Sequence, residues 1–165
     1  MKSFPHRYWV EASASADSPV PVASPGLETL LTAPPVEYDG PGDRWSPETL
    51  LVAAAADCFV LTFRAVAGAS SLAWVDLRCE GEGELNRVER TTRFTGMTIR
   101  AFLTIPAGGD VERAARILEK SERTCLVANS LACPVLLEPH VATQGSGPVA
   151  KAPRKGPAAG ARTER

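Results

Sequence analysis

The sequence feature that most constrains the fold is a long apolar stretch, residues 45–63, which reads WSPETLLVAAAADCFVLTF. It begins with the start signals of an α-helix. Ser46 is a favourable N-cap, Pro47 suits the first helical position, and Glu48 places negative charge where backbone N–H groups lack partners. We therefore expect a helix that begins at this serine.

The same stretch leaves no polar side for solvent. Between residues 50 and 63 only Asp57 and Thr62 interrupt the apolar side chains, so the helix is expected to be covered on every side. A membrane span needs about 20 apolar residues in a row, and the longest run here is residues 50–56. The stretch therefore predicts the central helix of a protein that does not enter a membrane, with Cys58 near its middle.

Length and charge narrow the class of protein further. With 165 residues, 44% of them hydrophobic, the chain suits a single domain. Residues 143–165 carry five basic residues and one acidic residue, which leaves 13 basic and 18 acidic residues, about −5, in residues 1–142. This balance argues against nucleic-acid binding. Residues 1–142 are expected to form the domain, and residues 143–165 a disordered basic tail, solvated or weakly docked to an acidic partner.

The cysteines indicate a reducing compartment. The first 13 residues lack the apolar core of a secretory signal, so we expect a cytoplasmic protein whose cysteines are thiols. The cysteines are Cys58, Cys79, Cys125 and Cys133. None forms a C-x-x-C pair, and His6 and His140 are isolated, so no metal site is expected.

Period-two patterns predict strands on both sides of the central helix. Residues 72–85 and 92–106 alternate apolar and polar side chains on either side of a turn at 86–90, which predicts a long antiparallel hairpin. Further strands are expected at 6–14, at 27–31 and at 135–141, and residues 16–26 form either a loop or a broken edge strand.

A second helix is predicted after the hairpin. Asp110 is a suitable N-cap for a helix from Val111 to about residue 123, and residues 124–133 predict a short helix or turn that opens at Thr124. Cys125 would then lie in the first turn of a helix, where backbone N–H groups favour a thiolate. Either Cys58 or Cys125, taken alone, is more simply a small packed hydrophobe.

Two segments resemble a known family. The segment SPETLLVAAAADCF resembles the motif around the first reactive cysteine of the OsmC/Ohr family, the osmotically inducible and organic hydroperoxide resistance proteins. The segment ERTCLVANSL resembles the family's second cysteine segment, and the likeness covers roughly residues 5–142. The resemblance implies an α+β fold with antiparallel sheets wrapped around the central helix, in an intertwined homodimer.

The resemblance also implies a thiol peroxidase. In that family the thiolate on the central helix attacks the peroxide and becomes a sulfenic acid, which a second cysteine resolves to a disulfide. Carried over, Cys58 is the peroxidatic thiol and Cys125 the resolving one. A hydroperoxide is the substrate, a dithiol such as a lipoyl protein or a small thiol is the reductant, and no metal or organic cofactor is needed.

An activating cation is also implied, because burial opposes ionisation of a thiol. In the family a loop arginine, held by a glutamate at the position of Glu48, supplies it. Arg44 is the candidate here, either paired with Glu48 or simply solvated, and Arg123 is a weaker substitute. Asp57 would raise the thiol pKa if it pointed the same way, although helical neighbours diverge by about 100°.

Helix geometry connects this site to assembly. Ten residues of helix separate Glu48 from Cys58 by ~15 Å and about 80° of rotation, so one chain cannot unite them. Two central helices running antiparallel about a two-fold axis would bring the glutamate of one copy to the thiol of the other. Two other readings stay open, a degenerate family member that binds a small apolar ligand without turnover, and a thiol redox sensor.

Overall fold

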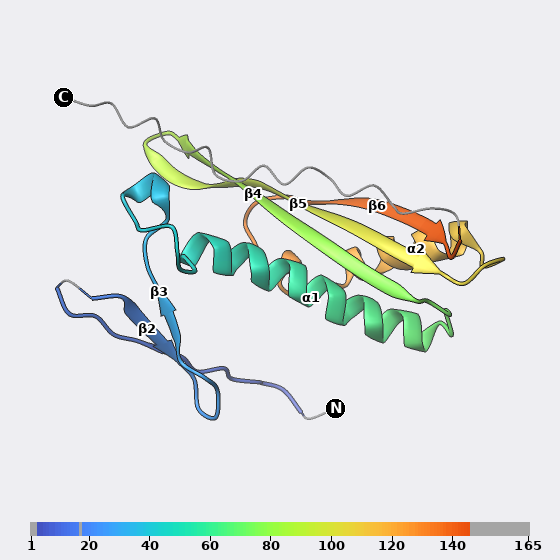
Figure 1. Ribbon diagram of the computed structural model, residues 1–165, viewed down its shortest axis with the longest axis horizontal. Helices are drawn as coiled ribbons and strands as arrows, with labels where there is room; N and C mark the ends of the chain where they lie inside the picture. Colours follow the sequence, from blue (N-terminus) through green and yellow to red (C-terminus); the bar gives the residue numbers. More distant parts are fainter. Residues whose placement is uncertain (1–2, 17, 146–165) are drawn as a thin grey trace.

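The computed structural model describes residues 3–16 and 18–145 as an α+β fold with two small sheets (Figure 1). The first sheet contains β1 (Glu11–Ala12), β2 (Val20–Ala23) and β3 (Leu30–Thr32). The second contains β4 (Asp76–Val88), β5 (Thr91–Ile105) and β6 (Val135–Thr143). Two α-helices, α1 (Pro47–Ala69) and α2 (Val111–Arg123), and two 3-10 turns, η1 (Val36–Tyr38) and η2 (Ala128–Ser130), complete the described elements.

The start of α1 confirms the prediction from the sequence. The Thr49 N–H donates to Ser46 Oγ at 3.2 Å, and the Ser46 N–H donates to Thr49 Oγ1 at 2.8 Å. This reciprocal cap satisfies two backbone donors at the helix end and typically stabilises a helix by about 1 kcal/mol. Ser46 is buried, so the cap also fixes where the helix enters the fold.

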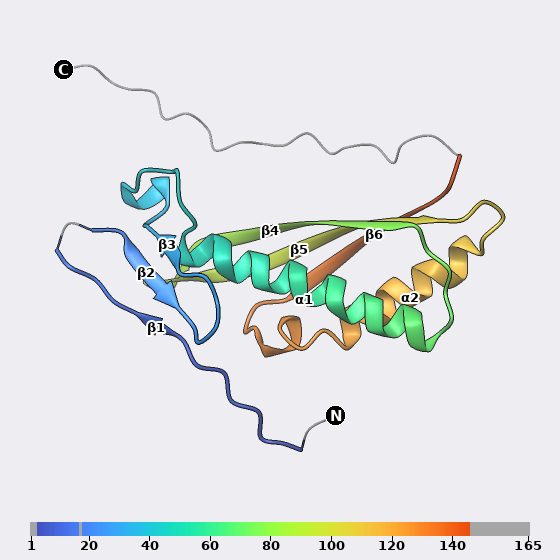
Figure 2. The ribbon, with the colours of Figure 1, turned by 60° about the horizontal axis from the view of Figure 1, so that its bottom comes forward.

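The long antiparallel hairpin is also confirmed. β4 and β5 pair along their length around a tight turn, whose central residues Glu89 and Arg90 both have positive φ, as a two-residue hairpin turn requires. Gly81 and Gly83 let α1 approach this sheet closely, because a Cβ at either position would lie within 3 Å of a Val52 methyl group. The first half of α1 therefore packs against the hairpin (Figure 2).

The prediction of purely antiparallel sheets is wrong for β6. This strand pairs with β5 in parallel, in the register Met97↔Val135 to Ile105↔Thr143. The reason is that α2 and η2 carry the chain from the end of β5 back to the beginning of the sheet, and a parallel pair needs such a crossover.

The N-terminal strand is much shorter than predicted. Only Glu11–Ala12 of the expected strand 6–14 pairs with a neighbour, and Tyr8 and Trp9 are 90% and 59% exposed. Residues 16–26 contain a strand after all, since β2 pairs with both β1 and β3 although it includes Pro21. In a single chain, the aromatic residues that favoured a strand before Glu11 contact no core.

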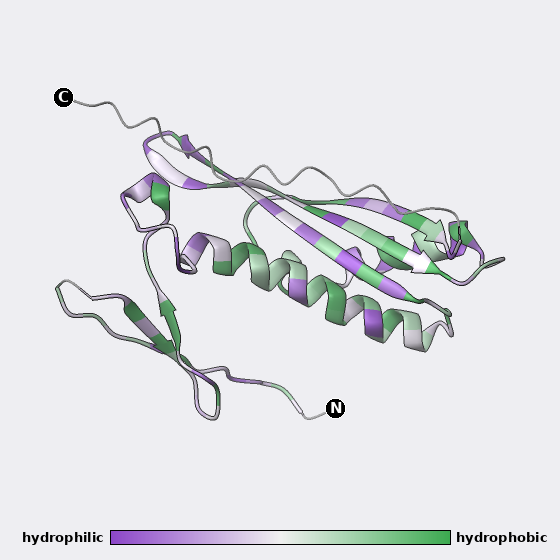
Figure 3. Cartoon of the chain, in the orientation of Figure 1, coloured by the Kyte–Doolittle hydropathy of each residue, from purple (hydrophilic) through white to green (hydrophobic). Residues whose placement is uncertain are grey.

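The core lies between α1, α2 and the second sheet. α1 contributes one stripe at helical spacing, Ala55, Phe59, Phe63 and Ala67. Val52, Ala56, Cys58 and Val66 are partly buried against this core, but Leu61 is 53% exposed, so the predicted coverage on every side is not met within one chain. The apolar character continues along the visible sides of the helix (Figure 3).

By length and composition, α1 is the one helix in the described ranges that could cross a bilayer. Its buried stripe instead packs on β5 and α2 residues of the same core. The predicted boundary between domain and tail falls close to the end of the described chain, and most of the predicted tail, residues 146–165, lies outside the described residues.

Candidate functional site

Two thiols far apart in sequence meet between α1 and the loop that follows α2. Cys58 is half-buried on α1, Cys125 is buried at 1% exposure, and the two side chains hydrogen-bond each other. Both are free thiols in the structure. The structure therefore brings together the two cysteines that the sequence singled out.

Residues 124–133 contain a turn and the short η2, as predicted, but no helix starts at Thr124. Thr124 is the C-cap of α2, and Cys125 follows it in a turn before η2. The prediction failed because 124–127 lack an N-cap bond, while the Thr124 hydroxyl instead donates to the Lys120 carbonyl at 2.9 Å and closes the preceding helix. Cys125 therefore lies after a helix end rather than in the first turn of a helix.

Backbone N–H groups of this turn nevertheless point at the thiols. The Val127 N–H donates to Cys58 Sγ at 3.5 Å. The N–H groups of Ala128 and Val127 also hydrogen-bond the Cys125 sulfur and lower its pKa. Every residue except proline carries a backbone N–H, so no sequence pattern could have marked these two as part of the site.

The balance of effects leaves Cys125 protonated. Burial raises the pKa of Cys125, and the hydrogen bond with Cys58 raises it further, against the smaller lowering by the backbone donors. A thiol that keeps its proton beside a second sulfur can donate a hydrogen bond to it.

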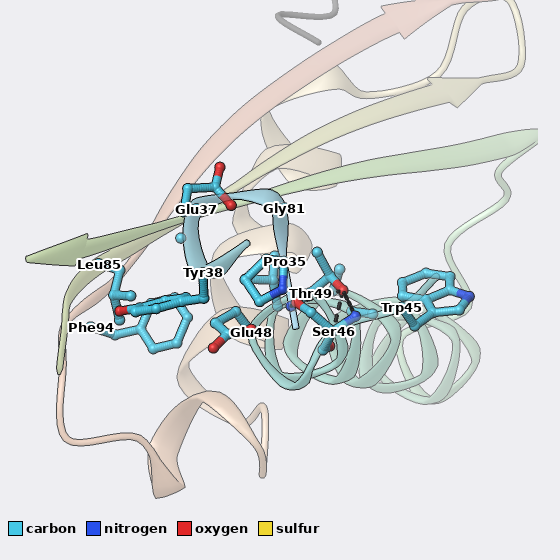
Figure 4. Close-up of a pocket in the computed structure, with 14 residues that line it drawn as sticks. Pro35, Glu37, Tyr38, Trp45, Ser46, Glu48, Thr49, Gly81, Leu85 and Phe94 are labelled. Atoms are coloured by element: carbon cyan, nitrogen blue, oxygen red, sulfur yellow. Dashed lines mark hydrogen bonds between the residues drawn. The ribbon is translucent and has the colours of Figure 1, made fainter. Parts of the chain in front are cut away.

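Glu48 lies elsewhere, in a hollow at the beginning of α1. The hollow has a volume of about 620 Å³ and is enclosed by α1, η1 and the β4–β5 hairpin. Tyr38, Leu85 and Phe94 supply much of its apolar wall, and Glu48 lies among them in Figure 4. Glu48 Oε2 is buried and accepts no hydrogen bond from the described part of the chain. A buried carboxylate oxygen without a donor is costly, so this atom needs a donor from beyond the described residues.

Trp45 belongs to this hollow as well. It lines the wall and is 49% exposed, and its carbonyl accepts from the Ala33 N–H at 3.0 Å, which ties the helix entrance to β3. Neither Cys58 nor Cys125 lines the hollow. The two halves of the predicted site, the thiol pair and the glutamate, are therefore separate within one chain.

Arg44 is not beside Glu48 in a single chain. Its ion-pair partner among the residues described is Asp43, with the Nε and Oδ1 atoms 3.7 Å apart, and both side chains line a smaller hollow against β2 and β3. The pairing of Trp45 with Thr32 holds the backbone in an extended form, in which successive side chains point to opposite sides. Arg123 is exposed at the end of α2. The role of Arg44 stays a prediction that needs a second copy of the chain.

Among the described residues, neither of the other two cysteines takes part in the hydrogen bonds of this pair. Cys79 packs against the core from β4, and burial raises its pKa to about 12 despite the nearby Arg78. Cys133 is half-buried before β6. No group of three or more His, Cys, Asp or Glu residues that could hold a metal ion occurs within residues 3–16 and 18–145.

The fold is α+β with an apolar central helix. Two free thiols meet in it, one from that helix and one from the turn after α2, which defines a small dithiol protein. Residues 40–139 match the family model described as OsmC-like protein, and the chain belongs to this family. The family includes organic hydroperoxide resistance proteins, which indicates a role in peroxide resistance or redox chemistry.

Individual relatives agree with this assignment. The chain is similar to the uncharacterized protein YmaD of Bacillus subtilis (strain 168), with 28% identity over 113 residues, 67% of this chain and 75% of that protein. The organic hydroperoxide resistance protein OsmC from Legionella pneumophila has a TM-score of 0.67 at 25% identity and covers 84% of this chain and 99% of its own. An OsmC-like protein of unknown function from Vibrio cholerae shares the fold, with a TM-score of 0.72 at 17% identity over 82% of this chain and 99% of its own.

Proposed function

We propose that the protein is a thiol-dependent peroxidase that reduces organic hydroperoxides through Cys58, with Cys125 as the resolving thiol. The observation that carries the proposal is the hydrogen-bonded contact between the two thiols across α1 and the turn after α2. Two cysteines from distant parts of a chain need not meet, and these meet with one sulfur buried and one half-buried. Membership of a family that contains hydroperoxide resistance proteins supports the same chemistry.

The proposed cycle balances without a metal or organic cofactor. The Cys58 thiolate attacks one peroxide oxygen, the O–O bond breaks, and the other oxygen leaves and takes up a proton as the alcohol. Cys58 is oxidised to a sulfenic acid, and the Cys125 sulfur then displaces its hydroxyl group as water to form a disulfide. An external dithiol, either a lipoyl protein or a small thiol, reduces the disulfide, which suits a reducing cytoplasm.

We also propose that the working form is a homodimer. Three features of the single chain support this, namely the uncovered side of α1 with Leu61, the exposed aromatic Tyr8 and Trp9, and the unpartnered Glu48 Oε2. Antiparallel pairing of two α1 helices would bring the Glu48 hollow of one copy to the thiol pair of the other. The apolar wall of the hollow would then accept the organic part of the hydroperoxide, and Arg44 would supply the activating charge.

The test is peroxide consumption with an alkyl hydroperoxide and dihydrolipoamide as the reductant. Cys58→Ser should abolish turnover, Cys125→Ser should stop it after one equivalent, and Cys133→Ser should leave it unchanged as the matched control. Mass spectrometry of the wild type after one equivalent of peroxide should find a Cys58–Cys125 disulfide. Turnover by the Cys58→Ser protein would overturn the proposal.

One observation favours a second function. The hollow of about 620 Å³ has an apolar lining and excludes both thiols, as expected of a family member that binds a small apolar ligand without turnover. Saturable binding of a fluorescent fatty acid that Phe94→Trp weakens, together with a Cys58 that does not react with peroxide, would favour this function. A redox sensor would form the same disulfide but cycle too slowly to remove peroxide.

A further inference from the structure

The turn after α2 presents backbone donors to a sulfur that lies in the middle of a helix. The N–H groups inside α1 are used by the helix itself, so Cys58 needs donors from another element. The Val127 N–H, 3.5 Å from Cys58 Sγ, is such a donor. Val127 itself is half-buried and packs against the core, so its position is set by packing as well as by the chain.

The turn is held rigidly by its own hydrogen bonds. The Asn129 N–H donates to the Cys125 carbonyl at 3.0 Å, and the Ser130 hydroxyl donates to the Leu126 carbonyl at 2.8 Å. The Asn129 side-chain amide donates to the Arg123 carbonyl at 3.0 Å, which ties the turn to the end of α2. The donors that face the sulfurs therefore cannot easily rotate away, which is the condition for a preorganised electrostatic site.

Within one chain, few charged side chains lie where they could act on the Cys58 sulfur. Asp57, next to Cys58 on α1, is exposed, and so are Arg64 further along α1 and Arg123 at the end of α2. In the described part of the chain, none of these three makes a hydrogen bond or ion pair to either sulfur. On β4, the neighbouring Cys79 is a thiol that burial keeps protonated. The group that faces Cys58 is the Cys125 thiol, which itself receives the Ala128 and Val127 N–H groups.

We infer that the backbone N–H of Val127 holds the Cys58 thiolate, so that the turn between Cys125 and η2 is a catalytic element and not only the carrier of the resolving cysteine. The inference rests on the proposed peroxidase function for its biological meaning, but its chemistry is the loss of one proton. The S–H bond of Cys58 breaks, the proton passes to solvent, and the negative sulfur strengthens its hydrogen bond with the Val127 N–H. The Cys125 thiol, still protonated, donates to the same sulfur.

The first experiment removes this donor with Val127→Pro, which the native φ of −68° at this residue accommodates. The readout is the rate of Cys58 alkylation by iodoacetamide, followed by mass spectrometry of the Cys58 peptide from pH 5 to pH 10. Because a hydrogen bond to a charged group contributes about 1.5–3 kcal/mol, the midpoint of the profile should move up by about one pH unit or more. Leu126→Ala truncates a side chain of the same turn that is 70% exposed, keeps the Val127 N–H, and should leave the midpoint unchanged.

A second experiment covers the case in which the proline variant does not fold. An α-hydroxy acid with the valine side chain, incorporated at position 127, replaces the N–H by an ester oxygen and should produce the same shift. The matched control is an ester at Ser130, whose N–H donates to the Val127 carbonyl at 3.0 Å. That ester should lower the thermal midpoint without moving the pH profile.

The outcomes separate the inference from the function. An unchanged profile in the 127 ester overturns the inference even if the wild type consumes peroxide. A shifted profile in a protein that shows no peroxide turnover supports the inference and overturns the proposed function. Equal shifts in the 127 and 130 esters would mean that general loosening of the turn moves the profile, and would also overturn the inference.

Discussion

The two halves of the chain differ sharply in how many of their side chains are buried within a single chain. The part from α1 to β6 contains nearly all of the core, whereas among the described residues 3–16 and 18–45 only Thr32 and Ala33 are buried. The same half presents Phe4, Tyr8 and Trp9 to solvent at 78%, 90% and 59% exposure. Aromatic side chains are rarely left exposed together without a partner. This difference agrees with the proposed homodimer, in which a second copy of the chain would cover the N-terminal half of the first.

The largest expected effect comes from removing a ring in each half. Phe63 is fully buried, so Phe63→Ala should lower the free energy of unfolding by about 3–5 kcal/mol. Tyr8→Ala should lower it by less than about 0.5 kcal/mol in the monomer, because Tyr8 is 90% exposed within one chain. Urea unfolding of both variants, at a protein concentration low enough to keep the chain monomeric, measures the contrast. A loss above about 1 kcal/mol for the tyrosine under these conditions would break the comparison, because Tyr8 would then pack within its own chain.

The open side of α1 gives the next effect. Leu61→Glu places a charge where the proposed dimer would bury an apolar side chain, so the dimer should dissociate at least about 10-fold more readily. Leu136→Glu is the control, because Leu136 is 62% exposed on β6, away from α1. Sedimentation equilibrium measures both variants. Equal behaviour of the two would remove α1 from the proposed interface.

Two serines sharpen the comparison at a smaller scale. Ser46 caps α1 and is buried, so Ser46→Ala should cost about 1 kcal/mol of stability. Ser24 donates from an exposed position to the Trp9 carbonyl at 3.0 Å, and Ser24→Ala should change stability by less than about 0.5 kcal/mol. Thermal unfolding of the two variants tests this. A larger loss of stability in Ser24→Ala would mean that the segment around Trp9 is held in a fixed position.

A further effect is a pH dependence that belongs to the C-terminal half, which holds all four cysteines. Burial raises the pKa of Cys79 from 9.0 to about 12. Between those values the unfolded chain loses this proton and the folded chain keeps it, so stability falls as the pH rises. The fall should be shallower in Cys79→Ala, measured by urea unfolding between pH 8 and pH 10.5. Identical slopes would mean that Cys79 ionises as freely in the fold as in the unfolded chain.

Sequence reasoning succeeded where the signal was local. The cap at Ser46, the hairpin of β4 and β5 and the cap at Asp110 depend on neighbouring residues, and all three are confirmed. The parallel direction of β6 was missed because its residues alternate in the same way for either direction. The arm before Glu11 was overestimated because its aromatic residues favour a strand only where a partner strand exists.

The candidate site likewise has parts that the sequence predicted and parts that it did not. The sequence named Cys58 and Cys125, and the fold brings them together, while their catalytic roles and those of Glu48 and Arg44 stay predictions. Three apolar wall residues of the hollow, Tyr38, Leu85 and Phe94, were missed, because they come from three separate elements. The Val127 donor was out of reach for a different reason, since only the folded backbone decides where an N–H points.

The parallel pairing of β6 has a practical consequence for anyone attaching a reporter. Its last residue, Thr143, pairs with Ile105, and the Gln144 N–H donates to the Ile105 carbonyl at 2.8 Å, beside the loop that follows α1. The Glu48 hollow lies at the opposite end of that helix. A fluorophore or affinity handle fused after the final strand would thus leave the described body at the end remote from the cavity, and surface immobilisation through it should keep the cavity mouth accessible.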